Sequence, residues 1–172
     1  MNKKDSIIKT YKRLVVERKT AEISVSEICR EAEVSRKTFY NHFIDRFEVI
    51  EQILISDIET PLLKALHLNY GHHQVVKLIF EYLLLDQDFY KIAIMENNQN
   101  SLFETLISRL TAINKEYDRE DDKKGFNKRE VEYLNYRFAV EIALMIRKWM
   151  EEGMQETPDF MAKVIVFPKH DR

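Results

Sequence analysis

The side chains best suited to chemistry in this 172-residue chain gather between positions 24 and 46. They are hydroxyls, cations, a tyrosine, an asparagine and a histidine, which can bind phosphates and the polar edges of bases. Phe39 and Phe43 stand four residues apart, so on a helix they would share one face and anchor it. The candidate binding residues are Ser24, Ser26, Ser35, Arg36, Lys37, Thr38, Tyr40, Asn41, His42 and Arg46.

Two short capped helices joined by a tight turn are predicted to position these residues. The sequence "SVSE" supplies Ser24 as an N-cap and Glu27 as the third helical residue of a capping box. Ser35 suits the N-cap of the second helix, and Asp45 begins the next one. This is the outline of a helix-turn-helix motif, whose second helix enters the major groove of DNA.

A helix over residues 5–18 is predicted to pack behind this pair and bury Ile28, Cys29, Val34 and Phe39. Many helix-turn-helix outlines are ordinary corners of helical bundles, so the outline alone does not establish DNA binding. The charge distribution favours it. Residues 1–46 hold eleven Lys/Arg and seven Asp/Glu, whereas residues 47–172 hold sixteen and twenty-two. The resulting +4 head and −6 body indicate that only the head meets a polyanion.

The rest of the chain reads as helical. Helical periodicity continues after Asp45 and over 73–85, 87–96, 101–118 and 128–152, with a polar, charge-alternating stretch at 115–130. Pro61 is expected to kink or end the helix that begins at Asp45. Gly153 suits the end of the 128–152 helix, and Thr157 with Pro158 begins a short last one. These patterns predict an all-α fold of about nine helices, with a three-helix head on a helical bundle.

Composition narrows the classes of protein. A single cysteine excludes an internal disulfide and fits a reducing cytosol, so we expect a cytoplasmic protein. We expect no membrane association, because no stretch has signal-peptide character or the length to span a bilayer. We expect neither an enzyme nor a cofactor, because none of the usual catalytic or nucleotide-binding motifs occurs. Three histidines, His67, His72 and His73, lack further ligands at metal-binding spacing, so no metal site is predicted.

The stretch "SVSEICREAEVSRKTFYNHFIDRFEVIEQIL" resembles the N-terminal region of TetR/AcrR transcriptional regulators, and the resemblance covers about residues 5–54. Its most specific part is the F-Y-x-H-F run with a basic residue three positions later. The resemblance implies that Tyr40, His42 and Arg46 contact phosphates, while Arg36, Lys37 and Thr38 contact bases. The family usually has Gly where this chain has Glu33, so Glu33 must adopt a strained φ or reshape the turn.

Phe47 is a second departure, since the family commonly has an acidic residue at that position. The tail "RKWMEEGMQETPDFMA", residues 147–162, resembles the end of a regulatory domain in a subgroup of these regulators. Its W-(x)3-G-(x)3-T-P spacing carries that resemblance. The subgroup includes regulators of unknown ligand and at least one activator that works with a protein partner.

The 131–150 helix has two apolar faces, and each needs a partner. One carries Val131, Leu134, Phe138, Ile142, Met145 and Trp149, and the other carries Tyr133, Tyr136, Val140, Ala143 and Leu144. The first is predicted to pack on its own bundle and the second on another copy of the chain. Glu141 interrupts the apolar run, so it pairs with Arg137, faces a pocket or faces its own copy across a dimer axis.

These observations predict a DNA-binding domain at 1–46 and a regulatory and dimerisation domain at 47–172. The expected partners are a second copy of the chain, a pseudo-palindromic operator in double-stranded DNA, and an effector. The first hypothesis is a dimeric repressor released by a small molecule, with Tyr82, Tyr90 and Glu141 as candidate ligand contacts. The alternative is an activator or scaffold whose C-terminal domain binds a protein. Cys29 is predicted to be a core residue rather than a redox sensor.

Overall fold

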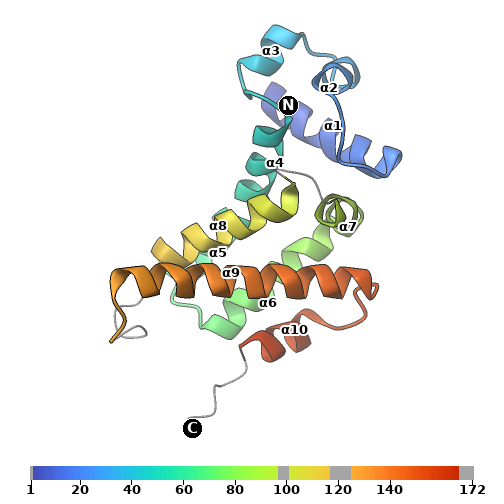
Figure 1. Cartoon of the computed structure of the whole chain (residues 1–172). Helices are drawn as coiled ribbons and strands as arrows, with labels where there is room; N and C mark the ends of the chain where they lie inside the picture. Colours follow the sequence, from blue (N-terminus) through green and yellow to red (C-terminus); the bar gives the residue numbers. More distant parts are fainter. Residues whose placement is uncertain (1, 97–100, 117–124, 167–172) are drawn as a thin grey trace. The chain divides into compact units, whose positions relative to one another are not determined.

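The computed structural model describes residues 2–96, 101–116 and 125–166, and these ranges contain helices but no strand. The predicted all-α fold is therefore confirmed. Residues 117–124 of the predicted polar stretch lie outside the described residues. In chain order the helices are α1 (Lys3–Arg18), α2 (Val25–Glu31), α3 (Arg36–Tyr40), α4 (Arg46–Leu54), the π-helical η1 (Ile55–Glu59), α5 (Thr60–His67), α6 (His72–Leu85), α7 (Gln87–Met95), α8 (Leu102–Glu116), α9 (Lys128–Glu151) and α10 (Pro158–Ile165). Figure 1 labels the α-helices.

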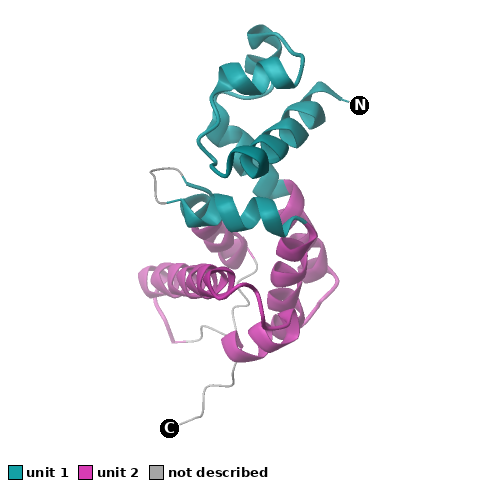
Figure 2. Cartoon of the chain, turned by 90° about the vertical axis from the view of Figure 1, so that its right-hand side faces the viewer, with its two compact units in different colours: residues 1–55, 86–105 teal, residues 56–85, 106–172 magenta. Residues whose placement is uncertain are grey.

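The chain divides into two compact units, drawn in separate colours in Figure 2. Unit 1 comprises Met1–Ile55 and Asp86–Thr105, and unit 2 comprises Ser56–Leu85 and Leu106–Arg172. Unit 1 thus joins the sequence-predicted head to α4 and to α7, a segment some thirty residues further along the chain. The predicted functional boundary between residues 46 and 47 is a different kind of division and stays a prediction.

The predicted caps form the helix starts of unit 1. Ser24, Ser35 and Asp45 each accept a hydrogen bond from a backbone N–H in the first turn of α2, α3 and α4. The predicted capping boxes are only half present. The Glu27 side chain turns to Arg18, and Glu48 accepts from the N–H of Ile44, one residue before the cap. Among the described helices, α9 has a complete box, in which Asn127 and Glu130 cap each other's backbone.

Helix α1 is the central element of unit 1, because α2, α3, α4 and α7 all pack on it. Its buried face is the predicted one, and consists of Ile7, Tyr11, Leu14 and Val15, with Thr10 beside them. Cys29 is buried within α2, and burial raises the pKa of its thiol. Its predicted assignment to the core is confirmed.

Pro61 acts differently from expectation. Helix α4 ends at Leu54, and the chain then passes through η1 into α5, with Pro61 in the first turn of α5. A proline there removes an N–H that the start of a helix leaves without an intrahelical partner. The break therefore lies before the proline, in the π-helical segment.

Unit 2 is built on α6, which packs on α5 and α10, while α10 also packs on α9. The predicted buried stripe of α9 was wrong by about one position. The most buried residues are Asn135, Ala139, Ile142, Ala143, Ile146, Trp149 and Met150. The prediction had weighted the large side chains, whereas the buried face of α9 includes the two small residues Ala139 and Ala143.

The W-(x)3-G-(x)3-T-P run is explained by the corner between α9 and α10. Trp149 donates from its indole N–H to the carbonyl of Glu156 at 2.9 Å, and its ring stands edge-on to Phe80. Gly153 has φ 80° just after α9, and Thr157 caps α10 directly before Pro158. Each residue of the pattern therefore shapes this corner.

Candidate nucleic-acid interface

The turn between α2 and α3 keeps a tight geometry despite the glutamate in it. Val34 donates its backbone N–H to the carbonyl of Cys29 at 3.0 Å, and Glu33 donates to Arg30 at 3.3 Å. These two bonds form the Schellman motif, whose C′ residue takes a left-handed conformation and is usually glycine. Glu33 occupies that C′ position with φ 52°. Of the two outcomes left open by the sequence, the strained φ is the one observed.

Two other helices end in the same motif within the part of the chain that the structure describes. At α5 the C′ residue is Asn69, and at α9 it is Gly153. Asparagine and glycine are the residues that tolerate the left-handed region best. Glu33 is thus the least suited of these three residues to its backbone conformation.

The two aromatic anchors lie where the spacing predicts. Phe39 is fully buried and Phe43 nearly so, with ring centroids 5.7 Å apart. Tyr40 stands edge-on to Phe39 but is 56% exposed. Helix α3 is shorter than expected, because it ends at Tyr40. Asn41 is its C-cap, and His42 lies in the following turn.

The remaining candidate residues form a polar surface on α2 and α3. Ser24, Ser26, Ser35, Lys37 and Asn41 are exposed, as is Arg36, while Thr38 and His42 are half-buried. Ser35 bonds the N–H and the hydroxyl of Thr38 and so fixes the start of α3. Arg36 donates from its guanidinium to the hydroxyl of Ser26, which links the two helices. The structure therefore brings these residues onto adjoining surfaces of α2 and α3.

Most of the cations in the head already have internal partners. Arg13 pairs with Glu17 and with Glu31, and Arg18 pairs with Glu27. The guanidiniums of Arg13 and Arg30 hold the pKa of the Glu31 carboxyl below its usual range. Among the described residues, no ion pair or hydrogen bond engages the ammonium of Lys37. Lys37 is therefore the cation of α2 and α3 most available to an external anion.

Arg46 is held more tightly than a surface cation. It is half-buried, donates to the backbone carbonyl of Ala21 at 3.4 Å and lies 4.8 Å from the centroid of the Phe47 ring. Phe47, the second departure from the family pattern, thus supplies a ring for the guanidinium of Arg46. Arg46 retains further N–H groups, so the internal bond does not prevent it from contacting a phosphate.

The candidate ligand contacts lie in different compact units. Tyr90 belongs to unit 1, where it is fully buried beside Phe89. Tyr82 is half-buried in unit 2, and Glu141 is exposed on α9. No ion pair joins Glu141 to Arg137, so the intrahelical pair, one of the three alternatives left open for Glu141, is absent. A ligand-binding role for these residues stays a prediction. Within the described ranges, no three ligand-type side chains are grouped around a common metal position.

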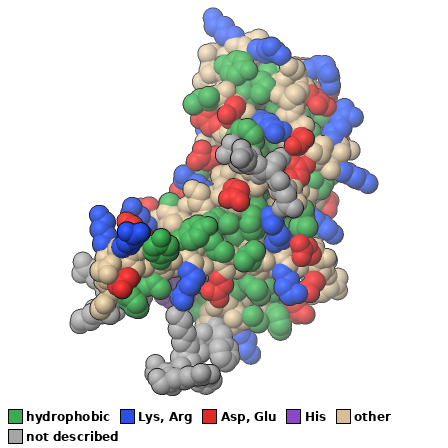
Figure 3. Space-filling model, viewed as in Figure 1, with side chains coloured by type: hydrophobic (Ala, Val, Ile, Leu, Met, Phe, Trp, Pro, Cys, Tyr) green, Lys and Arg blue, Asp and Glu red, His purple; other side chains and the backbone are tan. Residues whose placement is uncertain are grey.

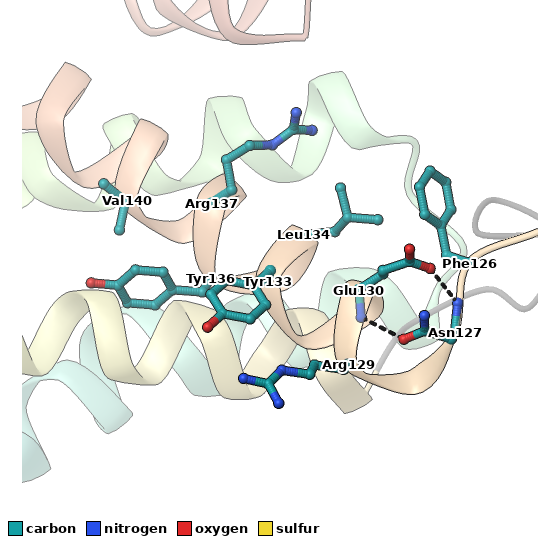
Figure 4. A pocket seen from close by; sticks show the side chains of 9 residues that line it. All are labelled: Phe126, Asn127, Arg129, Glu130, Tyr133, Leu134, Tyr136, Arg137 and Val140. Atoms are coloured by element: carbon teal, nitrogen blue, oxygen red, sulfur yellow. Dashed lines mark hydrogen bonds between the residues drawn. The ribbon is translucent and has the colours of Figure 1, made fainter.

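The second face of α9 carries an open apolar groove. Tyr133, Tyr136 and Leu144 are 65%, 53% and 52% exposed, and Val140 is half-buried. Figure 3 shows hydrophobic side chains gathered along this helix. The groove has a volume of about 740 Å³, and Figure 4 shows Phe126, Tyr133, Leu134, Tyr136 and Val140 around it. The sequence predicted the exposed tyrosines but not Phe126, which precedes the helix.

Comparison with known proteins identifies the family. A sequence model of the TetR family, described as a transcriptional regulator C-terminal region, matches residues 72–166, which is more than half of the chain. The chain belongs to the TetR family of transcriptional regulators. The family-typical features of the head, Tyr40, His42 and Arg46 beside the buried rings of Phe39 and Phe43, lie outside the matched region and agree with it. Among the described helices, none combines the length and apolar character that a membrane span requires.

Two regulators named DhaS are similar to this chain, one in sequence and one in structure. The HTH-type dhaKLM operon transcriptional activator DhaS of Lactococcus lactis subsp. lactis (strain IL1403) is 33% identical over 110 residues, which is 60% of this chain and 58% of that protein. The chain thus matches somewhat more than half the length of this curated relative. A solved structure of a dihydroxyacetone kinase operon activator DhaS has a TM-score of 0.62 at 22% identity, covering 95% of this chain and 92% of that one.

Other solved structures share the fold. A Syntrophomonas wolfei protein described as a TetR-family transcriptional regulator has a TM-score of 0.66 at 14% identity, with 95% of this chain and 90% of that chain covered. NalD, the secondary repressor of the MexAB-OprM multidrug efflux pump in Pseudomonas aeruginosa, has a TM-score of 0.56 at 15% identity, with 95% and 92% covered. At these identities the likeness establishes the fold alone.

Proposed function

We propose that this chain acts as a homodimer that binds a pseudo-palindromic operator in double-stranded DNA through residues 24–46. Helix α3 would enter the major groove, with Arg36, Lys37 and Thr38 toward the bases. Tyr40, His42 and Arg46 would contact phosphates, and the exposed residues Ser24, Ser26, Ser35 and Asn41 would complete the surface. The observation that carries this proposal is the polar surface of α2 and α3 over the buried rings of Phe39 and Phe43.

Lys37 provides the direct test of this surface. A duplex selected from a random-sequence pool by the full-length chain serves as the probe. Lys37→Ala should reduce affinity for it by ~1–3 kcal/mol and relax preference at one base position if Lys37 makes a bidentate base contact. Lys163→Ala is the matched control. It removes the same charge, and Lys163 is exposed on α10 in unit 2, away from the proposed surface in the sequence. Equal binding by both variants and the wild type would refute the assignment of the surface.

The second copy is proposed to pack on the apolar face of α9. An interface between identical copies is self-complementary, so each groove would meet the same helix of the other copy. Arg137 and Glu141 are exposed on this helix and not paired with each other. Across a two-fold axis each could pair with the opposite residue of the partner. This arrangement would explain why a carboxylate interrupts the apolar run.

Sedimentation tests the dimer. The wild type at micromolar concentration should have about twice the 20.7 kDa chain mass. Leu144→Arg should shift it toward the monomer, because a charge would be buried in the apolar contact. Phe160→Arg, which changes another half-exposed apolar residue on α10, should leave the dimer intact. A wild-type monomer would remove the basis for binding two half-sites.

Two modes of regulation are proposed for this dimer. In the first, the chain is a repressor, and a small molecule moves α4. This movement changes the separation of the two α3 helices of the dimer, which is about 34–36 Å in such dimers. In the second, the chain is an activator whose C-terminal unit binds a protein. The 33% sequence identity with a transcriptional activator supports the second mode. Transcription from a promoter that carries the selected duplex, measured with and without the chain, distinguishes repression from activation.

A further inference from the structure

One residue of the α1–α2 turn binds three helical segments of unit 1 at once. The backbone carbonyl of Ala21 accepts from the hydroxyl of Tyr11 in α1 at 3.0 Å and from Arg46 at the start of α4 at 3.4 Å. Its N–H donates to the carboxylate of Glu96, which directly follows α7, at 2.6 Å. The same carboxylate oxygen accepts from the hydroxyl of Thr20 at 2.5 Å.

The environment makes this junction well defined. Ala21 is 6% exposed and Tyr11 is fully buried. Burial raises the pKa of Tyr11 well above its usual value, so its hydroxyl remains a neutral donor, with nearby Arg46 opposing the shift and Glu96 adding to it. Hydrogen bonds to an ionised carboxylate are about twice as strong as neutral ones. The hydrogen bonds to the Glu96 carboxylate are therefore expected to be the strongest of those that hold the turn at residues 20 and 21.

Glu96 and Arg46 act on opposite sides of one residue. Glu96 binds the N–H of Ala21, and Arg46 binds its carbonyl. Without Glu96, the carbonyl of Ala21 keeps its bonds from the Tyr11 hydroxyl and from the N–H of Ile23, but the turn loses the restraint on its N–H side and the carbonyl can shift away from Arg46. The link joins positions 75 residues apart in the sequence, and both ends lie inside unit 1.

We propose that Glu96 is a positioning residue for DNA binding, which orients the phosphate-contacting Arg46 through the backbone of Ala21. This inference rests on the proposed DNA-contacting role of Arg46. It also assigns a role to α7 in the DNA-binding unit, since α7 carries Glu96 at its end. Movement of α7 would then change DNA affinity without any residue of α7 touching DNA.

The chain contains a matched control for this effect. Asp86, just before α7, pairs with Lys12 of α1 at 2.8 Å. This pair also ties α7 to α1, but it does not involve Ala21. Removing it should lower stability as an ordinary surface contact does, with DNA affinity unchanged. Asp86→Asn and Glu96→Ala therefore separate loosening of α7 from misplacement of Arg46.

The test is a double-mutant cycle on the full-length chain, measured with the duplex that the wild type selects from a random-sequence pool. Glu96→Ala should weaken binding by about two- to thirtyfold at a temperature where every variant is folded. Glu96→Gln, which keeps an acceptor oxygen for Ala21, should restore most of the affinity. In an Arg46→Ala background, Glu96→Ala should have no further effect, since its target is gone.

The outcomes distinguish the two levels of the proposal. If Arg46→Ala binds as the wild type does, the phosphate-contacting role of Arg46 is wrong and the inference fails with it. If Arg46→Ala weakens binding but Glu96→Ala does not, the inference alone fails. If Asp86→Asn weakens binding as much as Glu96→Ala, the effect is general loosening of α7 and the positioning role is refuted. The same conclusion follows if the effects of Glu96→Ala and Arg46→Ala are additive.

Discussion

Glu33 offers a sharp test, because it has two separable properties, a strained backbone and a charge. Its φ of 52° places an L-residue with a long side chain in the left-handed region. Its carboxylate is exposed in the turn that leads into α3, the helix proposed to enter the groove. We therefore consider three substitutions of Glu33. Glycine removes both the strain and the charge, asparagine removes the charge and part of the strain, and glutamine removes the charge alone.

The expected magnitudes follow from the two properties. The left-handed conformation costs an L-residue about 1–2 kcal/mol. A glycine would avoid this cost, but its greater conformational freedom in the unfolded chain lowers the stability by roughly 0.5–1 kcal/mol. Glu33→Gly should therefore raise the free energy of unfolding by about 0.5–1 kcal/mol, or the melting temperature by about 1–4 °C. Glu33→Asn should give a smaller gain, and Glu33→Gln should give none.

DNA affinity should follow a different order. Two like charges about 8–10 Å apart in water repel by roughly 0.4–0.5 kcal/mol, and salt screens this further. All three substitutions remove the charge, so all three should strengthen binding by about twofold per half-site at low salt. The control at another Schellman motif is Gly153→Ala, which imposes a φ of 80° on an L-residue and should be destabilising.

The assays are chemical denaturation and titration of a labelled duplex. If Glu33→Gln stabilises the protein as much as Glu33→Gly, the charge rather than the backbone is responsible. If Glu33→Gly is destabilising, glutamate is not strained at this position and the interpretation of the turn is wrong. If only the glycine variant changes DNA affinity, the effect of Glu33 on binding comes from turn geometry.

Two further predictions concern the rings. Phe39→Ala should lower the melting temperature, because deleting a buried Phe costs ~3–5 kcal/mol, whereas Tyr40→Phe should leave melting unchanged and weaken DNA binding by ~1.5–3 kcal/mol. Measuring both properties on both variants tests this crossed pattern, and unfolding by Tyr40→Phe would require a different orientation of α3. Trp149→Phe removes the bond to the Glu156 carbonyl and should reduce the free energy of unfolding by ~1–3 kcal/mol with DNA affinity unchanged. Denaturation by urea measures it, and an unchanged midpoint would show that the indole bond does not hold the α9–α10 corner.

Local patterns in the sequence predicted the head because the forces that shape it are local. Ser24, Ser35 and Asp45 cap helices through bonds to residues two or three positions away. Phe39 and Phe43 are buried together because the N–H of Phe43 bonds to the carbonyl of Phe39, as in one turn of helix, although α3 itself ends at Tyr40. The spacing of the rings also predicted correctly that Tyr40 faces outward. Such features require no knowledge of the tertiary structure.

The junction at Ala21 could not be predicted in this way. It joins a backbone N–H in a turn to the side chain of Glu96, and no periodicity links two such positions. The prediction of the buried face of α9 was wrong by about one position for a related reason. The exact orientation of a helix about its axis depends on the neighbouring helices, and the small residues Ala139 and Ala143 on the buried face give a weak hydrophobic signal.

The net charge of the head does not by itself indicate which of its cations are available to DNA. The sum of +4 over residues 1–46 counts every cation equally. In the structure, Arg13 and Arg18 neutralise carboxylates within the head, and Lys12 pairs with Asp86 of the second chain segment of unit 1. These cations add to the long-range field that attracts DNA, but each would have to break an internal pair to contact a phosphate. Lys37 has no such pair among the described residues, so it can bind an anion without that cost. We therefore expect this one lysine of the five-residue helix α3 to contribute more to DNA binding than the paired Lys12, Arg13 and Arg18.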